Sequence, residues 1–558
     1  MQYFIIIIGI VLAIVLWSRL TEIKNRKQLK DRLKREWGDT PKEEYTSEKM
    51  NSIKTYYQSI KDDRLDVDDI TWNDLDMDEI FMEMNNTQSS IGEEYLYALL
   101  RKPCFDEAEL AERSRLMRYL NENEEDRLKL QTGLFKVGKI KLISVYEYIN
   151  RLAAQKTESN FIHYLLDLGL LISIGLVFVY PGLGGFLTLA FFIINTFHYY
   201  SCKGKIENYL LVFSYIFRLL DSTRVFVRMD LPEIKAYTDR LKEDIRHFGK
   251  IQRGGFLLTP KSGSGDLLEI ILDYIRMLFH LDLIKFNSML DFFKKNRAEL
   301  NRIYETVGYL DSMLAAASFR NLIYYYCEPE LTRSGKPMLA ATELYHPLLE
   351  EPVPNSITEE QSVLITGSNA SGKSTFIKTL AVNAILCQTI HTATAKSYRG
   401  SFFQIYSSMA LRDNIFSSES YYIVEIKSLK RILDSVNDDI PTLCFIDEVL
   451  RGTNTLERIA ASSRILSSLA SKNTMVFAAT HDIELTHILD VAFSNYHFQE
   501  RIEEHQIIFD YLLYQGKAVS KNAIKLLDML GYPTEIIEGA EMAAQNFLTT
   551  GEWNKVSQ

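Results

Sequence analysis

One glycine-containing segment constrains the fold of this chain more than any other feature. It fits the pattern G-x-x-x-x-G-K-[S/T] and consists of Gly367, Ser368, Asn369, Ala370, Ser371, Gly372, Lys373, Ser374 and Thr375. In such a loop the glycines let backbone N–H groups turn inward around a phosphate, and the next helix points its positive end at the anion. An apolar run at 362–366 precedes the loop and a helical pattern follows it, as this mechanism requires. We therefore expect an α/β P-loop domain that binds a nucleotide.

Two side chains in the loop have separate expected roles. Lys373 should reach the β- and γ-phosphates, and the Ser374 hydroxyl should bind Mg²⁺. These roles, with the backbone cradle, predict a site for ATP and Mg²⁺.

Two acids and a histidine stand at the ends of other apolar runs. Asp447 and Glu448 follow the run 443–446, and His481 follows the run 475–479 closely. Buried strand ends rarely carry paired carboxylates without a reason, because burying a charge is costly. We expect Asp447 to support Mg²⁺, Glu448 to orient or deprotonate the attacking water, and His481 to sense the γ-phosphate. An exposed strand end and a plain surface histidine are the alternatives.

The 558 residues allow several domains. Past Leu339, short β-rich runs alternate with helical patterns, which is typical of an α/β domain with a mainly parallel sheet. Before it, apolar residues recur at helical spacing. We expect a multidomain protein with an all-α core and lever region, then the α/β ATPase domain. The expected parts are a transmembrane anchor at 1–20, a charged juxtamembrane linker at 21–65, the helical core at 66–160 and 201–335, a transmembrane hairpin at 161–200, and the ATPase domain at 336–558.

The run 3–17 is apolar without interruption and predicts the first membrane segment. Basic residues recur from Arg19 to Arg35 directly after it. By the positive-inside rule this flank is cytoplasmic. We therefore expect a protein of the inner or cell membrane, with its N-terminus outside and its ATPase domain in the cytoplasm.

The second apolar region, 161–200, is interrupted by the turn residues 181–185 and predicts a helical hairpin. Basic residues flank the hairpin and the turn is uncharged, so both ends should lie in the cytoplasm. His163 and Asp167 keep open a hairpin buried in a helical core, because ionisable groups in lipid are costly.

The formal net charge of −10 argues against a basic surface along the whole chain that would grip nucleic acid non-specifically. The five cysteines are widely spaced without a Cys-x-x-Cys pair, so they suggest neither a zinc site nor a disulfide framework.

Several motifs together resemble the MutS family of ATPases. The similarity is strong after residue 340 and weaker in the helical region from about residue 70. It is carried by Tyr345-His346-Pro347, the loop 366–375, the string Asp447-Glu448-Val449-Leu450-Arg451-Gly452-Thr453-Asn454-Thr455, and Ala479-Thr480-His481-Asp482. The resemblance implies an ATPase domain of the ABC/MutS type that works as a homodimer. It also implies that Asn454 contacts the nucleotide and that Ser420, in a segment similar to the family's signature region, reaches the partner's nucleotide.

The chain departs from the family's pattern at several positions. Ser418-Glu419 stands where the family has Gly-Arg, Leu450 replaces a glycine, and Pro352 replaces an aromatic expected to stack on adenine. In the family a separate N-terminal domain reads mismatched bases. Here the predicted membrane segment and linker occupy that place.

Three functions are compatible with the sequence. The first is a membrane-anchored MutS-like ATPase, related to DNA mismatch repair, that engages double-stranded DNA through its helical levers without its own mismatch-reading domain. The second is an ATP-driven membrane protein whose cycle moves the hairpin or a membrane partner, with no DNA bound. The third is a structural membrane protein with a degenerate ATPase, and the intact Lys373, Asp447 and Glu448 argue against it.

Overall fold

Among the residues that the structure describes, helices occupy the chain up to Leu322, and the first strand begins at Glu330. The computed structural model describes residues 2–154, 156, 158–249, 267–333, 336–368, 370–409, 421–451, 453–503, 506–518, 524, 527 and 531–553. Within these ranges the side chains of 2–16, 18, 153, 205, 207, 208, 267–272, 421, 501–503, 506, 507 and 548 are outside that description. The chain divides into two units. The first contains residues 1–62, 81–101 and 111–323, and the second contains 63–80, 102–110 and 324–558. The expected order, a helix-rich region and then an α/β region, is confirmed.

The first unit is built from helices. Helix α14 packs against α5, which also packs against α2. The helices that lie in this unit or continue into it are α1 (Gln2–Arg35), α2 (Ser47–Ile60), α4 (Met77–Met84), α5 (Ser90–Arg101), α6 (Glu107–Glu122), α7 (Glu124–Val137), α8 (Val145–Ala154), α9 (Phe161–Val177), α10 (Pro181–Arg228), α11 (Lys235–Arg246), α12 (Leu267–Leu278), α13 (Leu281–Lys295) and α14 (Arg297–Leu322), with a short 3₁₀ turn at Pro232–Ile234.

A fully buried carboxylate on α14 fixes the start of α5. Asp311 accepts hydrogen bonds from the backbone N–H groups of Gln88, at 3.0 Å, and Ser89, at 2.9 Å, and from the Ser89 hydroxyl at 2.5 Å. Gln88 and Ser89 come directly before the first residue of α5, and these bonds satisfy donors that burial would otherwise leave unpaired.

The second unit contains a six-stranded sheet in the order β12-β9-β4-β8-β7-β6. All neighbours are parallel except β12, which runs antiparallel to β9. The apolar runs before the loop, the acids and the histidine form strands of this sheet, as predicted. The strands of this sheet are β4 (Ser362–Thr366), β6 (Gln404–Ser408), β7 (Thr442–Asp447), β8 (Thr474–Ala479), β9 (Phe493–His497) and β12 (Tyr514–Gln515).

A second sheet has the order β1-β5-β2-β3, and a separate hairpin pairs β10 with β11. These strands are β1 (Glu330–Thr332), β2 (Leu339–Leu344), β3 (Asn355–Glu359), β5 (Ser397–Ser401), β10 (Glu500–Glu503) and β11 (Gln506–Phe509). The helices of this unit are α3 (Asp69–Asp74), α15 (Lys373–Ile390), α16 (Tyr421–Ser435), α17 (Thr455–Ala470), α18 (Ile483–Ile488) and α20 (Thr534–Thr550).

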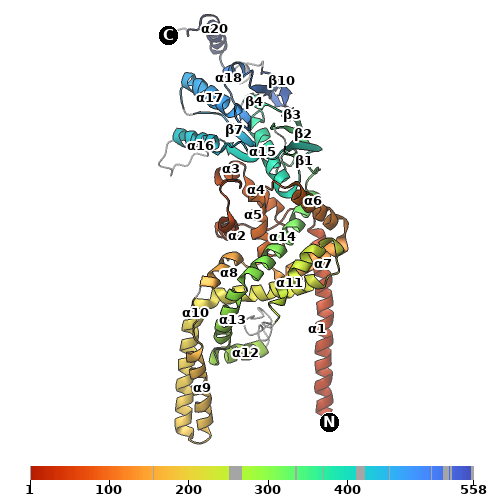
Figure 1. The fold of residues 1–558 in the computed structure, drawn as a ribbon, viewed down its shortest axis with the longest axis vertical. Helices are drawn as coiled ribbons and strands as arrows, with labels where there is room; N and C mark the ends of the chain where they lie inside the picture. The colour runs from red at the N-terminus through yellow and green to blue at the C-terminus, as the bar shows by residue number, and fades with distance from the viewer. Residues whose placement is uncertain are drawn as a thin grey trace. The chain divides into compact units, whose positions relative to one another are not determined.

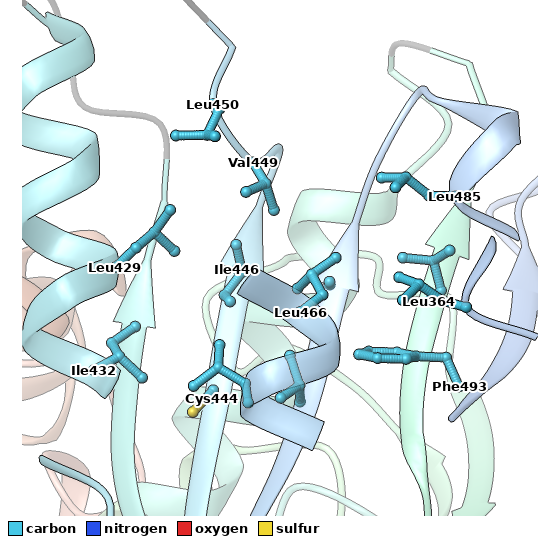
Figure 2. Close-up of a cluster of buried hydrophobic side chains, with 14 of the residues drawn as sticks. Leu364, Leu429, Ile432, Cys444, Ile446, Val449, Leu450, Leu466, Leu485 and Phe493 are labelled. Atoms are coloured by element: carbon cyan, nitrogen blue, oxygen red, sulfur yellow. The ribbon is translucent and has the colours of Figure 1, made fainter. Parts of the chain in front are cut away.

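The core on one side of the six-stranded sheet joins the strands to α16 and α17. Figure 2 shows Leu364, Cys444 and Ile446 on the strands, with Ile432 and Leu466 from the two helices close by. Each of these five side chains is at most 1% exposed. This packing fixes the strand ends that carry the predicted site.

An early segment of the chain is built into the second unit. Residues 63–80 include α3, whose Thr71 hydroxyl accepts a hydrogen bond from the backbone N–H of Ser407 at 3.0 Å. Asp74 accepts bonds from the Ser407 hydroxyl at 2.6 Å and from the backbone N–H of Met409 at 3.0 Å. Arg431 also pairs with Asp68 at 2.6 Å. The boundary drawn from the sequence differs, because it assigned this segment to the linker and the helical core.

The helices α9 and α10 form the predicted hairpin and lie side by side (Figure 1). Among the described residues, one helix, Pro181–Gly204, is long and apolar enough to cross a membrane, and Phe161–Val177 is apolar but shorter. Only 17% of the apolar window in 181–204 is buried, so the alternative of a hairpin buried in a helical core is wrong. The predicted anchor at 1–20 lies within α1, and its side chains up to residue 16 are outside the described part.

Candidate functional site

The loop after β4 has the backbone that its glycines predict. Gly367 has φ +146° and Gly372 has φ +109°, in a region that side chains disfavour. A Cβ atom on Gly367 would lie 2.7 Å from the carbonyl oxygen of Phe498. Position 367 therefore has no room for a side chain, and Asn369 lies outside the described residues.

Lys373, the first residue of α15, reaches back across the loop. Its Nζ donates hydrogen bonds to the carbonyl oxygens of Gly367, at 2.9 Å, and Ser368, at 2.7 Å. Burial lowers the pKa of Lys373, while the charges of Asp447 and Glu448 oppose that shift. The ammonium is thus held in the loop by neutral carbonyls, which an anion can replace as the stronger partner.

The parallel strands bring the separate sequence motifs to one edge of the sheet. Asp447, at the end of β7, is paired in register with Ala479 at the end of β8, which is paired with Ile365 near the end of β4. The backbone N–H of Thr480 donates to the carbonyl of Ile365 at 3.0 Å. The loop, the two acids and the histidine therefore follow three neighbouring strands at their carboxyl ends, where ligands bind in open α/β sheets.

Glu448 is held by His481 and Arg451. Its Oε1 lies 2.7 Å from His481 Nε2, and its Oε2 lies 2.8 Å from Arg451 Nε. The hydrogen bond from His481 is the main cause that lowers the pKa of Glu448, and the charges of His481, Arg451 and Lys373 add to it. Glu448 is therefore a carboxylate at neutral pH, which is the form that a general base requires.

The backbone after Glu448 turns through a left-handed conformation twice. Glu448 has φ +55° and Leu450 has φ +59°. The Leu450 side chain is 2% exposed, and its backbone N–H donates to the Glu425 carboxylate on α16. Burial raises the pKa of Glu425. Leucine thus occupies the position where the family has glycine, with burial and the bond to Glu425 offsetting the backbone strain.

Two predicted nucleotide contacts are not brought to the loop by the described structure. Asn454 is the N-cap of α17, and its side chain accepts a hydrogen bond from the backbone N–H of Glu457 at 3.0 Å. Ser420 lies outside the described residues, as do its neighbours 410–419. The expected roles of both residues remain predictions.

The sequence interpretation missed an aromatic cavity of about 250 Å³ beside the loop. Gly372 and Thr375 line it from the loop side. Its lining also includes Tyr345, His346, Pro352, Phe498 and Tyr511. Burial lowers the pKa of His346 to about 4, so its ring is neutral at pH 7. Phe498 and Tyr511 reach this cavity from parts of the chain distant from Pro352, which local spacing does not reveal.

Comparison with known proteins assigns the same region to a family. The family model for MutS domain V matches residues 363–548. MutS protein homolog 4 of Mus musculus is 29% identical over 334 residues, which cover 56% of this chain and 34% of that protein. DNA mismatch repair protein MutS of Thermus thermophilus is 29% identical over 200 residues, covering 35% of this chain and 24% of that protein. For the same protein of Thermus aquaticus the values are 30% over 205 residues, 36% and 25%. The matched region thus spans about a third or less of the length of these relatives.

Proposed function

Because this chain belongs to the MutS family, we propose that it binds and hydrolyses ATP with Mg²⁺ at the edge of the six-stranded sheet. The observation that carries the proposal is the meeting of the Lys373 loop with Asp447 and Glu448 at the ends of neighbouring strands. Hydroxyl and carboxylate oxygens from Ser374 and Asp447 are hard ligands that suit Mg²⁺. That ion would neutralise charge on the phosphates, and the aromatic cavity at Tyr511 would take the base.

The chain's own residues divide the work of hydrolysis. Lys373 leaves the carbonyls of the loop and binds phosphate oxygens. Glu448 orients the attacking water or accepts a proton from it. His481 bonds to Glu448 in the absence of nucleotide and turns to the γ-phosphate when ATP is bound. We further propose that two copies of the ATPase domain associate, with Ser420 and Asn454 contacting nucleotide in the assembled dimer.

The binding step is tested by comparing two lysines on the same helix. Replacing Lys373 by alanine is expected to weaken binding of a fluorescent ATP analogue about 100-fold, since charge-assisted bonds to phosphate are lost. Lys378→Ala is the matched control, because Lys378 lies on the same helix and its ammonium pairs with Asp76 at 2.7 Å. Equal affinity of the two variants would remove the phosphate role of Lys373.

The substrate of the ATPase cycle has two candidates. The names of the Thermus relatives describe DNA mismatch repair, which supports double-stranded DNA as the partner of the helical unit here. The exposed apolar hairpin favours the other candidate, an ATPase that sits at the cell membrane and acts on a membrane partner. We propose the DNA-binding function first, in a protein attached to the membrane.

A salt series separates these candidates. Duplex DNA binding by the detergent-solubilised chain, with and without ATP, is measured from 50 to 200 mM salt. If the helical unit contacts 6–10 phosphates, affinity should fall by about 10³-fold or more across that range, because bound counterions are released. Absence of binding at 50 mM salt removes the DNA function and leaves the membrane function.

A further inference from the structure

We propose that residues 168–194 form a re-entrant hairpin. It enters the hydrocarbon of a bilayer from the side where the rest of the chain lies and turns back without crossing. The inference rests on the membrane attachment proposed above, and it replaces the two-span topology expected from the sequence.

The hairpin carries an apolar coat on both arms. Residues 168–194 contain no Asp, Glu, Lys, Arg or His. Within them only Leu170, Ser173 and Gly184 are buried. Apolar side chains are exposed along both helices, for example Leu171, Ile172, Leu189 and Ile193. A protein partner covers one face of a helix pair, whereas lipid surrounds it, so exposure on successive faces of both arms fits hydrocarbon.

Three side chains in this segment carry a hydroxyl: Ser173 and Thr188 bond within the hairpin, and Tyr180 is exposed at the turn. The Ser173 hydroxyl donates to the carbonyl of Leu170 at 2.7 Å, and the Thr188 hydroxyl lies 3.3 Å from Ser173 Oγ. The arms can therefore lose water without leaving these hydroxyls unpaired.

The corner between α12 and α13 sets how deep the hairpin can enter. His280 forms that corner with φ +46° and is fully buried. Its Nδ1 lies 3.0 Å from Asp167 Oδ1 on α9, and its Nε2 lies 3.2 Å from the carbonyl oxygen of Asn195 on α10. Asn195 in turn donates to the carbonyl of Leu278 at 3.0 Å. The corner is thus fixed to both arms at the level of Asp167 and Asn195.

The two helices of this corner are not suited to lipid. Asp273 on α12 and Asp291 on α13 are exposed, and charged side chains in hydrocarbon are costly. The immersed part of the hairpin therefore begins beyond Asp167 and Asn195. Figure 1 shows the end of the α9–α10 hairpin extending past α12 and α13.

The remaining arms are too short to cross. Without Asp167 and Asn195 themselves, the arm from Asp167 to the end of α9 and the arm from the start of α10 to Asn195 have roughly 10 and 14 residues, or about 15 and 21 Å of helix. The hydrocarbon core is about 30 Å thick, and apolar stretches of about 10–14 residues are typical of re-entrant or interfacial segments rather than spans. The turn should then lie inside the bilayer.

The turn itself is built to remain in lipid. The backbone N–H of Phe178 donates to Gly175 at 3.2 Å, that of Tyr180 to Leu176 at 2.7 Å, and that of Gly184 to Tyr180 at 2.8 Å. Pro181 has no N–H to satisfy. The side chain of Phe178 is 86% exposed, which is costly in water and favourable in hydrocarbon. These N–H groups of the turn therefore have partners without water.

Cysteine reporters test this placement in the full chain. Cys202 and Cys327 are replaced by serine, and the other three cysteines are buried. Leu183→Cys reports the turn, with Gly182→Cys as a second reporter of the same position in case either substitution disturbs folding. Lys156→Cys, exposed before α9, is the matched control. Each variant is placed in sealed vesicles of phosphatidylcholine and phosphatidylglycerol, and a membrane-impermeant maleimide is added outside or trapped inside.

We expect position 156 to be labelled and the turn to be labelled from neither side until detergent is added. A fluorophore attached at position 183 before reconstitution should be quenched most strongly by nitroxides near the middle of the acyl chains. Labelling of the turn only from the side opposite position 156 means a spanning hairpin and overturns the proposal. Labelling from the same side means no insertion and also overturns it. ATP hydrolysis by the same vesicles is a separate readout, so failure of the ATPase proposal is distinguished from failure of this one.

Discussion

The Glu448→Gln variant is expected to keep ATP affinity within about threefold of the parent while kcat falls by about 10³, the range contributed by a positioned general base. Glutamine preserves the shape of the side chain and cannot take a proton from water. Both oxygens of Glu448 are engaged by His481 and Arg451, so the amide also exchanges two favourable contacts for weaker ones. The measurement is single-turnover hydrolysis together with equilibrium binding of the nucleotide.

The matched control is Glu484→Gln, which removes an exposed carboxylate from the first turn of α18 near the same sheet edge. It should leave both the ATP affinity and kcat unchanged.

The pH dependence of the parent is a second check. Because the partners of Glu448 lower its pKa below the usual 4.5, the base stays ionised as pH falls to 5. Parental turnover should therefore show no loss from protonation of Glu448 between pH 5 and 8. Hydrolysis by Glu448→Gln at more than a third of the parental rate would refute the assignment.

The largest expected effect on stability lies in the first unit, at Asp311. Replacing Asp311 by alanine leaves the backbone N–H groups of Gln88 and Ser89 buried without an acceptor, at a cost of about 3–5 kcal/mol. Hydrogen exchange measures this locally. The amides at the start of α5 should lose protection by about 100-fold or more, where each factor of ten corresponds to about 1.4 kcal/mol.

Asp239→Ala, at an exposed position on α11, is the control and should leave exchange in α5 unchanged.

The contribution of Asp311 to stability also depends on pH. Burial raises the pKa of Asp311 to about 6, so the folded state binds this proton more tightly than the unfolded state. That contribution is fully present below about pH 4 and is lost as pH rises through 6. The stability advantage of the parent over Asp311→Asn, which does not titrate, should therefore shrink from pH 4 to 7. A constant difference would contradict a raised pKa.

The parts that the sequence predicted share one property, which is that their signal is local. The loop 367–375 and the strands before Asp447 and His481 are defined by residues within a few positions of one another, so their type and order could be read directly. Parallel pairing then placed them together, because the carboxyl ends of adjacent parallel strands share an edge.

The parts that were missed depend on contacts between distant residues. Phe498 and Tyr511 line the cavity beside Gly372 from more than a hundred positions away, and no periodicity links them to it. Glu425 reads as one more polar residue on a helix, yet its carboxylate holds the backbone of Leu450. The apolar pattern at 161–200 predicted two apolar helices correctly, but the depth proposed for them rests on the contacts of His280, which come from a distant part of the chain.

The early segment 63–80 has a consequence for how the chain is made. Its Trp72 and Leu75 are at most 1% exposed in the second unit, so they need residues from 324 onward as packing partners. Roughly 240 residues must be synthesised in between, which takes about 12–50 s at about 5–20 residues/s. During that interval Trp72 and Leu75 lack the packing partners that follow residue 324. The core of the sheet beside Lys373 and Glu448 is completed only after the helical unit has been synthesised. Synthesis therefore orders the two units in time, with the helical unit available before the ATPase edge is complete.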